Sequence, residues 1–252
     1  MSPIGIALFA FACILGGAAS GLLVGSRLPE HHLASESKDV VRLSMAMIAT
    51  LTALVLGLVT ASAKSAFDAE DAAIKNTAAA VLSLDRMLAD YGPEAKGVRD
   101  NLQRALTERV AATWPDDVHV NVVRAPVGTS PSEVIVREIL GLTPQTDAQQ
   151  WYKARALDLS DGILKARWIV FGGSESAVPT MFLVVIICWL TVLFGSFGLF
   201  APFNATVSGS LLICSLSVAA SIFLILEMNT PFSGVMKISS APMQYALAHI
   251  DQ

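Results

Sequence analysis

Four long apolar runs dominate the pattern of hydrophobic and polar positions. They cover about residues 4–24, 41–63, 179–200 and 207–228. Each is long enough to cross a bilayer as an α-helix, which takes roughly 20 apolar residues. The first run lacks the basic segment that precedes the core of a cleaved signal peptide, so we expect a retained helix. The pattern predicts transmembrane hairpins in residues 1–63 and 179–228 and a C-terminal tail in residues 229–252.

A polar stretch, residues 64–178, separates the two hairpins and continues the second span as a helix. Phe67, Ile74, Val81 and Leu88 recur every seven residues, and Leu84 and Tyr91 follow three residues after the last two. This spacing is typical of a coiled-coil seam. Gly92-Pro93 should end the helix.

Three more helices are predicted in the polar stretch. The first covers about residues 94–113, the second opens at Ser130-Pro131 and ends at Gly141, and the third opens at Thr143-Pro144 and runs to about Phe171. Ser130 and Glu133 fit a capping box around the second start. The alternation of Val118, Val120 and Val122 permits a short extended segment, too solitary for a sheet.

The expected fold class is therefore an all-α membrane protein, with four transmembrane helices and a helical extramembrane domain inserted between helices 2 and 3. Composition agrees, because 54% of residues are hydrophobic and 15% charged, against about 45–50% and 25% in soluble domains. A net charge of -4 argues against a nucleic-acid partner. Lys and Arg near the span ends favour a cytoplasmic domain.

No catalytic constellation is found in the sequence, so an enzyme is not expected. Paired Ser/His/Asp spacing, glycine-rich phosphate loops and metalloprotease motifs are absent. His31-His32 and Asp116-Asp117 fit solvated loops better than metal ligands, and the three cysteines lie in apolar runs. We expect neither a cofactor nor a metal site.

The second span carries two different stripes. A bulky stripe contains Met45, Ile48, Thr52, Val55 and Val59. A small, partly hydroxylated stripe contains Ala46, Thr50, Ala53, Gly57 and Thr60. Small residues in lipid allow close helix packing. Alternatively, several copies of the span surround an axis, and the bulky stripe forms an apolar neck that gates by dewetting.

Three acids, Asp68, Glu70 and Asp71, follow this span. On one chain they form an ordinary solvated face. Repeated around an axis, they would make a negative ring at a pore mouth and favour cations.

The last span ends in an unexpected acid, in the string FLILEMNTPFSG. Glu227 lies in the last helical turn, where the helix dipole makes a carboxylate unfavourable by about 0.3–1 kcal/mol. One reading is an acid that reaches water at the membrane interface. The other is an acceptor for donors of another element, which fixes the helix end.

Three strings, ATLTALVLGLVTASAKSAFDAED, VLSLDRMLADYGPEAKGVRDNLQRAL and LSVAASIFLILEMNTPFSGVMKISSAPM, resemble the bestrophin-like membrane proteins of bacteria, a group related to the bestrophin ion channels. The resemblance implies a pentamer whose second span lines the pore. It also implies a tail that folds back on the cytosolic domain. Asn229, Pro231, Phe232 and Gly234 are similar to the Asn-Pro-Phe-Gly turn of bestrophins. The expected structural anchor consists of Glu227, Asn229, Pro231 and Phe232.

The chain also departs from the bestrophin pattern. Residues 235–240 contain no acid, so the calcium clasp of the calcium-activated members is not expected. Ile48, Val55 and Val59 stand where animal bestrophins have aromatic neck residues.

The expected function is a homopentameric, passive ion channel in the bacterial inner membrane, with inorganic ions and lipids as partners and a slight preference for cations. The alternative is a non-conducting membrane scaffold or sensor whose helical domain binds a partner.

Overall fold

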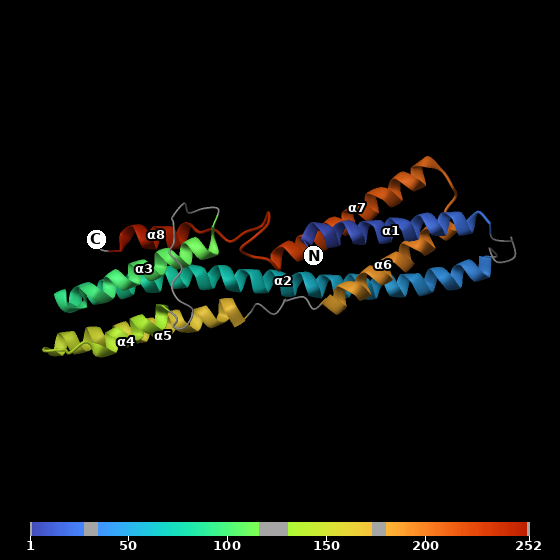
Figure 1. Cartoon of the computed structure of the whole chain (residues 1–252). Coiled ribbons are helices and arrows are strands. Elements are labelled where there is room, and N and C mark those ends of the chain that lie inside the picture. Colours follow the sequence, from blue (N-terminus) through green and yellow to red (C-terminus); the bar gives the residue numbers. More distant parts are fainter. Residues whose placement is uncertain (1, 28–34, 116–130, 173–179, 251–252) are drawn as a thin grey trace. The chain divides into compact units, whose positions relative to one another are not determined.

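The computed structural model describes residues 2–27, 35–115, 131–172 and 180–250. In these ranges the chain is helical and contains no strand, which confirms the all-α prediction. The elements, in chain order, are α1 (Pro3–Gly25), α2 (Ser35–Tyr91), the 3-10 turn η2 (Pro93–Ala95), α3 (Lys96–Thr113), α4 (Pro131–Gly141), α5 (Asp147–Gly172), α6 (Thr180–Phe200), α7 (Ala205–Met228) and α8 (Ala241–His249) (Figure 1). The features predicted at His31-His32 and in residues 116–122 lie outside the described ranges.

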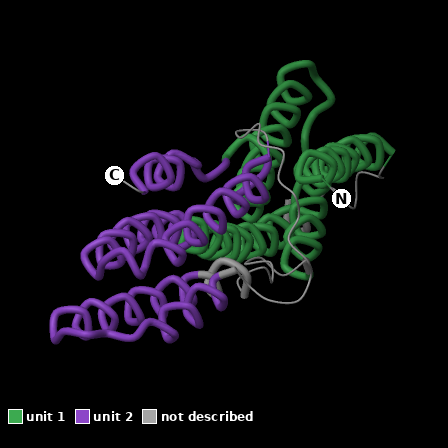
Figure 2. The backbone as a smooth tube through the Cα atoms, turned by 60° about the vertical axis from the view of Figure 1, so that its left-hand side comes forward, with its two compact units in different colours: residues 1–67, 176–230, 234–236 green, residues 68–175, 231–233, 237–252 purple. Residues whose placement is uncertain are grey.

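Four of these helices, α1, α2, α6 and α7, are long and apolar enough to cross a membrane. The chain groups into two compact units (Figure 2). Unit 1 contains residues 1–67, 176–230 and 234–236, and unit 2 contains residues 68–175, 231–233 and 237–252. The proposed membrane boundaries of the domains stay a prediction.

Unit 1 is built on close packing of α1 against α6. Gly17 and Gly21 of α1 face the backbone of Thr191 and Gly195 of α6, with no room for a Cβ on either α1 glycine. Small residues let two helix backbones approach in this way. Isoleucines from α1, α6 and α7 fill the core beside this contact: Ile14, Ile186, Ile222 and Ile225 are fully buried.

Unit 2 is built on the predicted seam of α2. Ile74, Val81, Leu84 and Leu88 are all buried, which confirms the seven-residue spacing as a packed face. Gly92 then adopts a φ of 125°, a conformation that side chains other than glycine rarely take, and this turn reverses the chain into α3.

A buried ion pair links the two arms of this hairpin. The Arg99 Nε–H donates to Asp85 Oδ1 at 2.8 Å and Nη2–H donates to Asp85 Oδ2 at 3.1 Å. Asp85 is only 1% exposed. Both oxygens of the Asp85 carboxylate therefore accept a hydrogen bond from Arg99. A buried carboxylate without such a partner would destabilise the fold.

The start of one helix and the presence of another differ from the predictions. Helix α5 begins at Asp147 rather than at Pro144, because the hydroxyl of Thr146 accepts the Gln149 N–H at 3.2 Å and caps the helix there. Helix α8, Ala241–His249, was not predicted in the tail. Pro242, near its first residue, is a sequence signal for a helix start in the tail.

Candidate functional site

The predicted bulky stripe of α2 lies on the packed side of the helix. Thr52 and Val59 are 4% and 7% exposed, and Val59 belongs to the core of unit 1. Ile48 and Val55 pack partly buried against the same core, and Met45 is half-buried. Thr52 and Val59 therefore help to join α2 to the core of their own chain. The assignment of the bulky stripe to an apolar neck stays a prediction.

Within the described ranges, the opposite face of α2 is exposed. The predicted small stripe is exposed throughout, from Ala46 to Thr60. Large apolar side chains lie beside it, including Leu43 and Leu54, which are 76% and 69% exposed. A Cβ added to Gly57 would meet no atom within 4 Å. One whole side of the second span is therefore open to lipid or to another chain.

The hydroxyls on this exposed face are turned back to the helix. Thr50 Oγ1–H donates to the Ala46 carbonyl at 2.9 Å, and Thr60 Oγ1–H donates to the Leu56 carbonyl at 2.7 Å. Each hydroxyl proton is therefore used within the helix, while its oxygen lone pairs remain available as acceptors. The face presents oxygen atoms among apolar and small side chains.

The three predicted pore-mouth acids do not share one face of α2. Asp68 and Asp71 are three residues apart and lie on neighbouring positions of one side. Asp71 accepts a hydrogen bond from Lys75 Nζ at 2.6 Å. Glu70 lies on a different side, half-buried, and burial raises the pKa of its carboxyl. Its Oε2 has no hydrogen-bond partner among the residues that the structure describes. Asp68 and Asp71 are thus the two acids that an exposed ring could contain.

Glu227 is buried at the end of α7, with 2% of its surface exposed. Its Oε2 accepts the backbone N–H of Val235 at 2.6 Å and of Met236 at 3.2 Å. This geometry matches an acceptor for another segment, whereas a solvated interfacial acid would be exposed. The carboxylate holds the returning chain against the helix end.

Three other residues complete this turn. The Thr230 N–H and Oγ1–H both donate to the carbonyl of Glu227, at 3.0 and 3.2 Å. Gly234 has a φ of 93°, and a Cβ there would collide with the Glu227 carboxylate. Asn229 is the C-cap residue of α7. The turn therefore requires glycine at residue 234 for both its dihedral angle and its space.

Pro231 and Phe232 belong to unit 2, and Phe232 contacts Trp114, the residue that follows α3. The ring of Phe232 lies edge-on to Trp114, with centroids 5.7 Å apart. The Trp114 Nε1–H donates to the Ile238 carbonyl at 2.9 Å, and the Ile238 N–H donates to the Pro231 carbonyl at 2.8 Å. Trp114 thus joins the end of α3 to the tail. A lone Trp-Pro pair in the sequence gives no signal of that partner.

The tail continues into α8, which packs on unit 2. Met243 and Ala246 are fully buried, and α8 contacts α3. No group of three or more His, Cys, Asp or Glu side chains that could hold a metal ion occurs in the part of the chain that the structure describes.

Comparison with known proteins places these features in one family. The bestrophin-like domain model matches residues 12–243, a range that includes the larger part of the first candidate span, the other three spans and the turn at Glu227. No curated protein and no solved structure gives a significant match. Since the match covers most of the chain, from α1 to α8, the chain belongs to the bestrophin-like family.

Proposed function

We propose that this protein is a homo-oligomeric, passive ion channel in which the α2 helices of several copies surround a common axis. Family membership supports the kind of function. The observation that carries the proposal is the division of α2 into a packed side and a side left uncovered over the length of the span. A ring of such helices uses the packed side to join its own chain and the uncovered side to face the axis or a neighbour.

The proposed pore wall is formed by positions on the uncovered side of α2 that are spaced alternately four and three residues apart. It consists of Leu43, Met47, Thr50, Leu54, Gly57 and Ala61, all exposed. This spacing keeps one side of a helix toward a common axis. Leu54 lies near the middle of the span and is the member of this wall between Thr50 and Gly57. It is the proposed constriction, which would close by excluding water.

The remaining features of the proposal concern ions and membrane. Asp68 and Asp71 follow the span and would attract cations, although Lys75 offsets part of the charge of Asp71. We propose a pentamer in a bacterial inner membrane with the polar domain in the cytoplasm. The exposed apolar side chains of α1 and α7, such as Phe9 and Leu216, would contact lipid.

Ion flux through purified protein in liposomes tests the proposal. Leu54→Ala should increase flux, because it widens the constriction and lowers the cost of wetting it. Leu216→Ala, a matched change on an exposed position of α7, should leave flux unchanged. The mass of the detergent-solubilised complex gives an independent measure of the number of copies.

The result decides between two functions. If the wild type and Leu54→Ala conduct no ion across a range of ions and pH, the channel proposal fails and the non-conducting scaffold or sensor becomes the better interpretation. A monomer or dimer in membrane-like conditions would also exclude a ring of α2 helices. Equal effects of Leu54→Ala and Leu216→Ala would exclude Leu54 as the constriction.

A further inference from the structure

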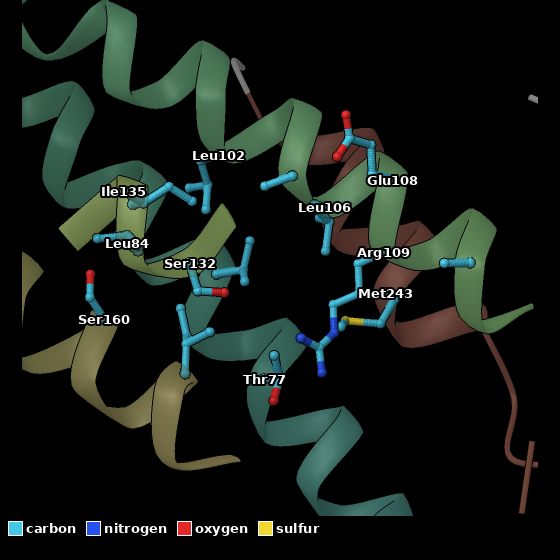
Figure 3. Close-up of a pocket in the computed structure, with 14 residues that line it drawn as sticks. Thr77, Leu84, Leu102, Leu106, Glu108, Arg109, Ser132, Ile135, Ser160 and Met243 are labelled. Carbon is cyan, nitrogen blue, oxygen red and sulfur yellow. The ribbon is translucent and has the colours of Figure 1, made fainter. Parts of the chain in front are cut away.

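Unit 2 contains a pocket that the proposed channel function does not use. Its volume is about 270 Å³, and its walls come from α2, α3, α4, α5 and α8 (Figure 3). Apolar side chains make most of the wall, among them Val81, Leu84, Leu102, Leu106, Ile135 and Met243. An apolar cavity with few polar groups, between the helices of a bundle, is the usual form of a small-molecule site.

The polar groups of this pocket differ in what they still offer to a ligand. Thr77 Oγ1–H donates to the Ala73 carbonyl at 2.7 Å, and Ser160 Oγ–H donates to the Ala156 carbonyl at 2.8 Å. These two hydroxyl protons are therefore already used by their own helices. The remaining polar side chains of the lining are Glu108, Arg109 and Ser132.

Arg109 brings a positively charged group to the wall of the pocket. Figure 3 shows its side chain extending into the space, whereas the carboxylate of its neighbour Glu108 points away from it. A guanidinium carries five N–H donors, so it can hold an anionic ligand in addition to a partner within the protein. Its flat fork matches the two oxygens of a carboxylate.

Ser132 supplies a second group suited to an anion. It is the second residue of α4 and lies in the pocket lining. A serine hydroxyl can donate a hydrogen bond to an oxygen of a bound anion, so Ser132 adds a second polar group to that of Arg109.

We propose that this pocket binds a small amphipathic carboxylate, with its apolar body among the leucines and isoleucines and its carboxylate on Arg109. The volume of about 270 Å³ lies just below the roughly 300–1,000 Å³ range of drug-sized ligand pockets, so the ligand must be small. A short-chain or medium-chain fatty acid has this chemistry. The site lies wholly within unit 2 and does not rest on ion conduction.

Calorimetric titration of the full chain in nanodiscs of zwitterionic lipid tests the proposal, with octanoate as the probe. Empty nanodiscs at the same lipid concentration provide the blank for partition into lipid. Octanamide and octylammonium have the same chain with a neutral and a positive head. Octanoate should bind best and octylammonium should not bind, because a cation in the pocket would face the Arg109 guanidinium.

Three variants separate the headgroup contact from the apolar body. Arg109→Gln should weaken octanoate binding by about tenfold or more, as expected when a charge-assisted hydrogen bond is lost, and should leave octanamide unchanged. Arg104→Gln removes an exposed arginine of the same helix and should change nothing. Ala105→Phe fills the pocket and should abolish binding of both ligands.

The proposal fails under any of three results. These are no octanoate binding above the blank, equal octanoate affinity for wild type and Arg109→Gln, or binding of octylammonium as tight as that of octanoate. The thermal unfolding midpoint of each variant shows whether it is folded. If Arg109→Gln does not fold, full octanoate affinity in folded Ala105→Phe refutes the site by itself.

Discussion

The turn at the end of α7 permits a quantitative test of the role of Glu227. Glu227→Ala removes the acceptor for two backbone N–H groups, of Val235 and Met236. Hydrogen bonds to a charged group contribute about 1.5–3 kcal/mol each. Val235 and Met236 are exposed, so water can replace part of the loss. We therefore expect the free energy of unfolding to fall by about 2 kcal/mol in total.

The second half of the test uses Gly234. Gly234→Ala places a side chain at a φ of 93°, which costs roughly 1–2 kcal/mol, and its Cβ collides with the Glu227 carboxylate. In the Glu227→Ala background the carboxylate is gone and only the backbone cost remains. The two substitutions should therefore be non-additive, with the penalty of Gly234→Ala smaller by about 1 kcal/mol in the double variant.

Thermal unfolding in one detergent, followed by intrinsic fluorescence, measures both effects. A chain of this length shifts its midpoint by about 2–4 °C per kcal/mol, so Glu227→Ala should lower it by roughly 4–8 °C. Asp90→Ala removes an exposed acid and should change stability by less than about 0.5 kcal/mol. The reasoning is refuted if Glu227→Ala behaves like Asp90→Ala, or if the penalty of Gly234→Ala is the same in both backgrounds.

Two further predictions test the packing of each unit. Gly21→Ala should lower the free energy of unfolding by about 1–3 kcal/mol, and with it the thermal midpoint, because the added Cβ would collide with the backbone of α6. Gly16→Ala is the control, since a Cβ there meets no described atom within 4 Å. Equal midpoints for the two variants would contradict the close approach of α1 and α6. Asp85→Asn should lower the free energy of unfolding by about 3 kcal/mol, because it removes the buried carboxylate that pairs with Arg99. Arg155→Gln breaks an exposed ion pair and should lower the free energy of unfolding by less than about 1 kcal/mol. Denaturant unfolding measures both variants, and equal losses of stability would contradict the role of burial.

The sequence predicted the extramembrane seam correctly because water sorts side chains by polarity. In α2 beyond Asp68 the apolar positions Ile74, Val81 and Leu88 repeat among polar ones, so the buried side is readable from the spacing. Local signals also predicted the ends of helices, as at Gly92, where the turn needs a positive φ.

The same reasoning does not identify the covered side of the second span, because lipid does not separate side chains by polarity as water does. Lipid-facing and protein-facing positions of a membrane helix are both apolar, so bulk alone gave no indication that Thr52 and Val59 would be covered. The covered side was decided by the glycine contacts that bring α1 and α6 together and by the isoleucine core that they leave for α2 to complete.

By itself, the sequence determined the helices, the four candidate spans and the unusual position of Glu227. Length, periodicity and the helix dipole each depend on one short stretch of the chain. Only the tertiary structure decided which partners those groups meet. The N–H groups that Glu227 binds come from eight and nine residues further along the chain, and the carbonyl that Trp114 binds is 124 residues away. Periodicity describes one helix, whereas a hydrogen bond between distant residues depends on where the whole chain folds.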